Sequence, residues 1–87
     1  MTLNQLARRT PAIVESVEET TPNDAIARRL REIGFVAGEQ VEVVAAGPFG
    51  AEPLLVQVGF TRFALRRIEA ARVRLRTPHR QTPGEGA

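Results

Sequence analysis

The chain contains no cysteine, tryptophan, tyrosine or lysine. Without cysteine it can form no disulfide, no thiolate metal site and no cysteine nucleophile. Its four phenylalanines must supply all of the aromatic packing. No segment approaches the roughly 20 apolar residues of a membrane-spanning helix, and the N-terminus has no apolar run like that of a signal peptide. We therefore expect a cytoplasmic protein.

The length and the missing catalytic groups both argue against an enzyme. Eighty-seven residues are enough for one domain, and a chain this short has little room for an active-site cleft beside its core. The single histidine, His79, stands beside Pro78 in a polar terminal segment where nothing would orient it. We therefore predict a binding protein that has no catalytic residues and requires no cofactor.

The charge is distributed unevenly along the chain. All twelve basic residues are arginine, and the net charge is +2. Residues 1–61 hold five arginines and eight acidic residues, whereas residues 62–87 hold seven arginines and two glutamates. The basic last third lacks interleaved aromatic side chains that would stack on bases, so we expect no nucleic-acid binding. A surface for an acidic protein segment is the favoured interpretation.

The clearest helix signal covers residues 22–33. Thr21 suits the N-cap, Pro22 suits the first helical position, and Asp24 would then occupy the third helical position, as the acidic residue of a capping box does. We therefore expect the helix to begin at residue 22.

The interior and the end of this helix also have clear signals. Ile26, Leu30 and Ile33 are spaced to form one apolar stripe. Gly34 follows where a left-handed residue commonly ends a helix, which would pair Leu30 with Phe35 in a Schellman motif. We expect Leu30 and Gly34 to be structural residues.

Five short segments have the composition of β-strands. In the last of them, Val73 and Leu75 alternate with arginines, so the valine and leucine should face inward and the arginines outward. Gly38 and Gly59 stand in predicted tight turns, where a positive φ is expected. The predicted strands are residues 12–17, 40–46, 54–58, 62–65 and 71–76.

So few short strands bury one face most easily when the sheet closes on itself. The predicted fold is therefore mainly β: a small, partly open five-stranded barrel with one inserted helix. Residues 77–87 have nothing to bury, and we expect a disordered tail after a single domain at residues 1–76.

Two stretches of the chain resemble the family of ferrous iron transport protein A. From Arg28 to Val43 the chain has an Arg-Leu pair, an Ile-Gly step, an apolar pair, and a glycine before a valine-rich strand. Residues 64–71, which read ALRRIEAA, follow a Gly/Pro loop at residues 47–50 and match the later part of the family pattern. The resemblance covers about residues 3–76. It departs at Ala37, where the family commonly carries proline.

The resemblance implies a function that composition and spacing do not. It implies an SH3-like barrel in the bacterial cytoplasm that binds and modulates the GTP-dependent ferrous iron permease as a non-catalytic adaptor. The same domain type occurs at the C-terminus of metal-dependent repressors of the diphtheria-toxin-repressor type. The alternative hypothesis is therefore a free-standing metal-sensing or nucleic-acid-binding domain.

Apolar side chains at loop tips are the best candidates for partner contact. Phe49 and Phe60 both stand in predicted turns, where each is either folded over the barrel or exposed. We take these two, with nearby Arg62, as contact residues, and place Arg28 and Arg31 on the exposed helix face second. Edge strands and apolar loop tips would also permit a weak homodimer.

The acidic residues do not predict a metal site. We expect Glu18, Glu19 and Asp24 to interact with the helix N-terminus and with solvent. The less favoured alternative is a cation site that combines oxygen ligands from these residues and from Glu39, Glu42 or Glu52. His79 alone would bind a divalent cation only adventitiously.

Overall fold

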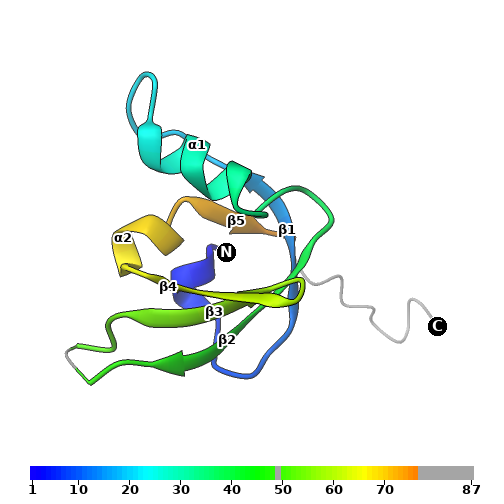
Figure 1. The fold of residues 1–87 in the computed structure, drawn as a ribbon, viewed down its shortest axis with the longest axis vertical. Coiled ribbons are helices and arrows are strands. Elements are labelled where there is room, and N and C mark those ends of the chain that lie inside the picture. The colour runs from blue at the N-terminus through cyan, green and yellow to red at the C-terminus, as the bar shows by residue number, and fades with distance from the viewer. Residues whose placement is uncertain (49, 77–87) are drawn as a thin grey trace.

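Five antiparallel strands form one sheet in the computed structural model, which describes residues 1–48 and 50–76. Their order across the sheet is β4-β3-β2-β1-β5 (Figure 1). A 3₁₀ turn, η1 (Leu3–Gln5), and two helices, α1 (Ala25–Glu32) and α2 (Arg67–Ala70), complete the fold. The strands are β1 (Ala12–Val17), β2 (Gln40–Ala46), β3 (Leu54–Val58), β4 (Thr61–Leu65) and β5 (Val73–Leu75).

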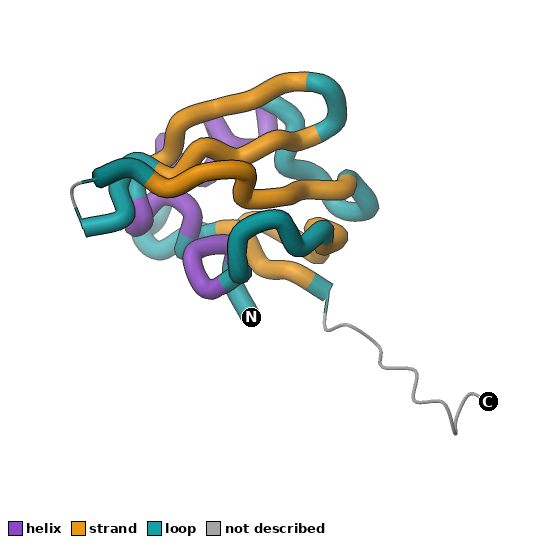
Figure 2. The backbone as a smooth tube through the Cα atoms, turned by 90° about the horizontal axis from the view of Figure 1, so that it is seen from below, coloured by secondary structure: helices purple, strands orange, loops and turns teal. Residues whose placement is uncertain are grey.

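Strand β1 joins the two halves of the sheet. Its first residues, Ala12 and Ile13, pair with β2, and its residues from Val14 to Val17 pair with β5, with a register shift between Val14 and Ser16. The sheet therefore curls, and β5 lies on the opposite side of the molecule from β3 (Figures 1 and 2). This mainly β, partly open arrangement with an inserted helix confirms the predicted fold class.

The core follows the alternation of the strands. Val73 and Leu75 of β5 are buried, which confirms their predicted inward orientation, and Val41 and Val43 of β2 are buried as well. Further apolar side chains come from outside the sheet: Leu3 of η1, Ala27 and Leu30 of α1, Phe35, and Ala70 of α2. The first three predicted strands have the predicted bounds. The fourth begins one residue earlier, at Thr61, and the fifth is only Val73–Leu75.

The two edges of the sheet differ. The outer edge of β5 is covered by the N-terminus, because the Leu75 amide donates a hydrogen bond to the Met1 carbonyl at 2.9 Å and Thr2 forms an isolated bridge with Arg74. Among the described residues, strand β4 has no strand on its outer side. No helix within the described ranges is long and apolar enough to span a membrane.

Helix α1 begins three residues later than predicted. Asn23 has a φ of 59°, which is incompatible with the helical path, so the helix starts after it. The N-cap is Asp24 and not Thr21: the Asp24 carboxylate accepts hydrogen bonds from the amides of Ile26 at 3.0 Å and Ala27 at 3.3 Å. The predicted helix 22–33 is therefore wrong at its start.

The end of α1 has the predicted Schellman motif. The Phe35 amide donates to the Leu30 carbonyl at 3.0 Å, and the Gly34 amide donates to the Arg31 carbonyl at 3.3 Å. Gly34 has a φ of 125°, which disfavours any residue with a Cβ. The motif turns the chain so that Phe35 enters the core, where it is fully buried.

A buried ion pair connects the start of α1 to the segment before β5. Arg72 Nε donates to Asp24 Oδ2 at 2.8 Å, and the two side chains are only 11% and 3% exposed. Arg72 Nη2 also donates to the Thr20 hydroxyl at 2.9 Å. The prediction that the arginines near the last strand face outward is therefore wrong for Arg72, because Asp24 provides a buried acceptor for it.

We predict that Asp24 makes the protein sensitive to acid. The Arg72 guanidinium and the Thr20 amide hold the pKa of the Asp24 carboxyl well below its usual value of 3.8. Asp24 therefore takes up a proton more readily in the unfolded chain than in the folded one. The ionised Asp24 carboxylate thus stabilises the folded state above about pH 4, and this contribution is lost as the pH falls further. Urea titrations between about pH 5 and pH 2 should show a steep loss of unfolding free energy in the wild type and a shallower one in Asp24→Asn.

The matched control is Glu15→Gln, which removes an exposed carboxylate from β1. It should keep the wild-type dependence on pH. Equal slopes for Asp24→Asn and the wild type would contradict the assignment.

Candidate functional site

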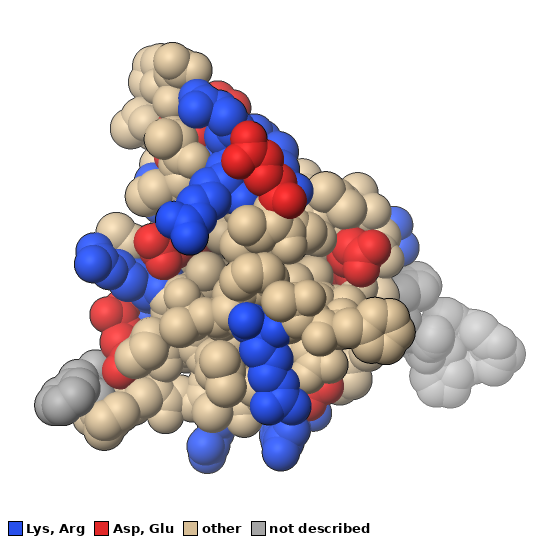
Figure 3. Space-filling model, in the orientation of Figure 1, with Lys and Arg blue, Asp and Glu red and all other residues tan. Residues whose placement is uncertain are grey.

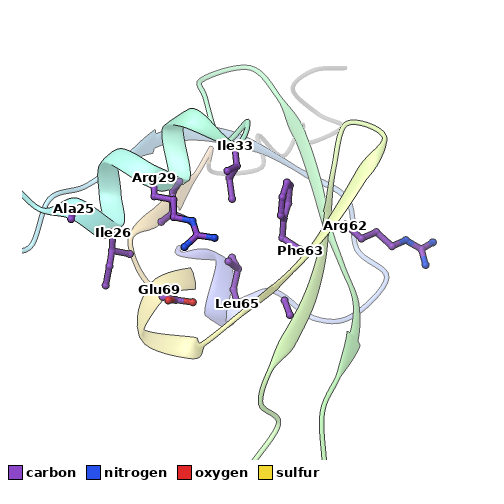
Figure 4. A pocket seen from close by; sticks show the side chains of 10 residues that line it. Ala25, Ile26, Arg29, Ile33, Arg62, Phe63, Leu65 and Glu69 are labelled. Atoms are coloured by element: carbon purple, nitrogen blue, oxygen red, sulfur yellow. The ribbon is translucent and has the colours of Figure 1, made fainter.

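A groove with a cavity of about 510 Å³ lies between α1 and β4 (Figure 4). Its apolar walls come from Ile26, Leu30 and Ile33 of α1 and from Phe63 and Leu65 of β4. These α1 residues are the apolar stripe predicted from the sequence. Leu30 is buried, but Ile26 and Ile33 are only partly buried, because the helix stands apart from β4. The stripe therefore packs against the core and also lines the groove.

Phe63 occupies a boundary between the core and the groove. Its ring lies 6.3 Å from that of Phe35, centroid to centroid, at an interplanar angle of 52°. Phe35 is fully buried, whereas Phe63 is only partly buried and lines the cavity. Phe63 therefore packs against the core and also lines the groove, because within the described residues no strand lies beyond β4 to cover it.

Charged side chains flank the apolar walls. Arg29 of α1 and Glu69 of α2 both project toward the gap, whereas Arg62 points away from it (Figure 4). Arg62 Nε donates to Gln57 Oε1 at 3.0 Å. Within residues 1–48 and 50–76, neither Arg29 nor Arg62 forms an ion pair. Two arginines near the groove are thus available to a negatively charged partner.

The β3–β4 hairpin presents an exposed aromatic side chain. Gly59, with a φ of 59°, and Phe60 form its two-residue turn, and the Phe60 side chain is fully exposed. The Gly59 amide donates to the Gln40 carbonyl at 3.4 Å, which places this tip beside the turn containing Gly38, whose φ is 94°. Val36, in that second turn, is also exposed. Both turns have the glycine geometry predicted from the sequence.

The structure brings only some of the predicted contact residues together. Phe60 and Arg62 share one hairpin. Arg28 and Arg31 lie on α1 but do not line the groove, and Arg31 is already engaged, because its Nη2 donates to the Val17 carbonyl at 3.0 Å. Phe49 lies outside the residues that the structure describes.

Arg29 lines the groove but is not among the contact residues predicted from the sequence. Its position could have indicated this role, because it is three residues after Ile26 and four before Ile33, on the same side of the helix. A charged residue next to an apolar stripe usually faces solvent. Only the gap between α1 and β4 shows that this charge lies beside a cavity.

The acidic residues near the helix start do not gather into one cluster. Glu18 pairs with Arg74 at 3.2 Å, and Glu19 pairs with Arg31 at 3.5 Å. In the part of the chain that the structure describes, no group of three histidine, cysteine or acidic side chains could hold a metal ion. His79 lies outside that part.

The basic last third is not one free basic face. Arg72 is partly buried against Asp24, and Arg74 pairs with Glu18. Figure 3 shows charges of both signs over α1 and a mainly uncharged surface between them and the strands below. The apolar lining of the groove thus lies beside charges of both signs.

The chain is similar to one family along most of its length. The FeoA domain family matches residues 1–77. Stenotrophomonas maltophilia FeoA, whose crystal structure contains zinc, is 67% identical in sequence to this chain. The two structures match with a TM-score of 0.81, and the match covers 86% of this chain and 88% of that chain. That protein is described as a unique prokaryotic SH3 domain protein and a candidate activating factor of bacterial ferrous iron transport. This likeness confirms the SH3-like barrel.

More distant relatives have the same fold. Chlorobium tepidum FeoA is 31% identical, with a TM-score of 0.73, and the match covers 86% of this chain and 68% of that chain. Iron(II) transport protein A of Clostridium thermocellum is 28% identical, with a TM-score of 0.74, covering 86% of this chain and 44% of that chain. A search of curated proteins found no match.

We predict that substitution of the exposed Phe60 has little effect on stability, whereas substitution of the buried Phe35 strongly destabilises the fold. Phe60→Ser should change the melting temperature by less than about 4 °C, because the ring makes no buried contact. Phe35→Ala should cost about 3–5 kcal/mol, because it leaves a cavity in the core. Thermal denaturation followed by circular dichroism measures both. A large destabilisation by Phe60→Ser would show that this ring packs on the barrel.

Proposed function

The chain belongs to the FeoA family, and on that premise we propose that it is a non-catalytic adaptor of bacterial ferrous iron uptake. It binds the GTP-dependent ferrous iron permease at the cytoplasmic face of the membrane and modulates its activity. The description of the 67% identical Stenotrophomonas protein as a candidate transport activating factor supports this proposal.

The exposed Phe60 side chain is the observation that carries the proposal. An aromatic ring held in water at a hairpin tip contributes nothing to the barrel's own core. Burying such a ring against a partner gains roughly 1.5–3 kcal/mol. Val36 in the adjacent turn extends the apolar surface, and Arg62 adds a positive charge on the same hairpin. These features suit a partner with an apolar pocket and an acidic rim.

The helix arginines have a secondary role in this interface. Arg28 is exposed, and its Nη2 donates only to the Asn23 side chain at 3.1 Å, so it can turn toward a partner at little cost. Arg31 is held by the Val17 carbonyl and by Glu19, and a partner would have to compete for it. We therefore rank Arg28 above Arg31.

We predict that Phe60→Ala weakens binding to the permease about tenfold, as expected for a buried ring that is lost from an interface. The assay is retention of the purified chain on immobilised full-length permease in detergent, together with the rate of GTP hydrolysis with and without the chain. Ile68→Ala is the matched control, since Ile68 is another exposed apolar side chain, on α2.

The two readouts separate the function from the site. If the permease neither retains the wild-type chain nor changes its GTP hydrolysis rate, the adaptor function is wrong. If Phe60→Ala binds as well as the wild type and as Ile68→Ala, the function stands and the hairpin tip is not its contact site.

A further inference from the structure

The outer edge of β4 has backbone groups that pair with no strand in the described part of the chain. In an antiparallel pair, residues alternate between those that exchange hydrogen bonds with the neighbouring strand and those whose amide and carbonyl point to the other side. Val58 and Thr61 flank the two-residue turn, so they are a bonded pair, and the same holds for the Val56–Phe63 pair. The amide and carbonyl of Arg62 and Ala64 therefore face the outer edge.

These four backbone groups are accessible to a partner. Arg62 and Ala64 are both exposed. Beyond the β3–β4 ladder, the described residues make no hydrogen bond to the backbone of either one. The β5 edge is different, because the N-terminal residues cover it. The sheet thus leaves one of its two edges open.

This open edge borders the apolar groove. Phe63 and Leu65 turn their side chains toward the cavity, and α1 forms the wall across from them (Figure 4). A strand added to β4 would direct every second side chain toward the same cavity. The volume of about 510 Å³ is within the range typical of ligand sites, so an apolar side chain fits there.

The charges around the groove favour an acidic occupant. Arg29 lies on the helix wall, Arg62 lies on β4, and Arg66 is exposed just after the strand. The one acidic side chain of the groove lining, Glu69, accepts a hydrogen bond from the Arg66 amide at 2.8 Å. A second copy of the chain would bring its own arginines to the same edge, and this like-charge contact disfavours a β4–β4 dimer.

We propose that β4 and the groove bind an extended acidic segment of a partner protein by β-strand addition. An apolar side chain of the segment, opposite Phe63, enters the groove. Its neighbours exchange hydrogen bonds with the backbone of Arg62 and Ala64, and their carboxylates lie near Arg62. This inference rests on the adaptor function only for the identity of the partner, since the groove can be tested with peptides alone.

The probe is a capped nine-residue peptide, Gly-Glu-Val-Glu-Val-Glu-Val-Glu-Gly, added to the ¹⁵N-labelled full chain. On saturation, hydrogen exchange of the Arg62 and Ala64 amides should slow at least about tenfold, because both gain a bonded partner. Two control peptides separate the contributions. One carries N-methyl groups on its glutamates, which removes the donors facing β4, and the other replaces each glutamate with lysine. Both should bind at least about tenfold more weakly.

Variants of the chain test the same contacts from the other side. Ala64→Pro removes an outward amide without breaking the ladder with β3, and should weaken peptide binding about tenfold. Arg62→Glu should also weaken it, whereas Arg8→Glu, the same charge change in an exposed loop outside the groove lining, should not. If Ala64→Pro fails to fold, the N-methylated peptide makes the same test on the wild type.

The results distinguish the alternatives. Equal affinity for the N-methylated peptide, or unchanged exchange at Arg62 and Ala64, overturns strand addition. Slowing of these amides with rising protein concentration, without peptide, would identify a second copy as the occupant and overturn the acidic segment. Peptide binding without permease binding would leave the groove intact and remove the adaptor function. If the permease retains Ala64→Pro as well as the wild type, and the wild type binds no peptide, the adaptor function stands and the groove is not a binding site.

Discussion

The Asp24 carboxylate connects the start of α1 to the segment before β5. Its oxygens accept hydrogen bonds from the first amides of α1, from the Thr20 amide and from Arg72, which is 48 residues later in the chain. Because the guanidinium and the carboxylate are nearly buried, either one alone would be left as an uncompensated charge. The position of α1 over the curled sheet thus depends on this pair, and α1 forms one wall of the groove.

The position of α1 leaves a gap beside β4. The Schellman motif at Gly34 ends the helix and sends Phe35 into the core, so the chain leaves α1 without crossing the gap. The molecule has two apolar surfaces, one that projects and one that is concave. Phe60 projects from the hairpin and needs a pocket in a partner, whereas the groove beside β4 can receive a partner's side chain. The proposed adaptor thus has two separate places at which to recognise a partner.

The arginines have different tasks, although the sequence presents them as one basic segment. Arg72 is part of the buried pair, Arg74 is paired with Glu18, and Arg67 Nη2 donates to the Asn4 carbonyl at 3.0 Å. These three connect parts of the fold. Arg29 and Arg62 form no ion pair within the described ranges; Arg29 projects toward the groove, whereas Arg62 points away from it on β4. Family membership supports the proposed role in iron transport, and the groove adds the chemistry of a partner that would fit it.

The sequence by itself determined which segments form strands, helix α1 and turns. Alternating apolar residues gave the strands, the spacing of Ile26, Leu30 and Ile33 gave the helix stripe, and glycines marked the turns, because these signals depend on neighbours along the chain. The resemblance from Arg28 to Val43 indicated the family for the same reason. The start of α1, the burial of Arg72 and the groove were decided only by the tertiary structure. Each depends on residues far apart in sequence, such as Asp24 and Arg72, whose contact no local pattern records.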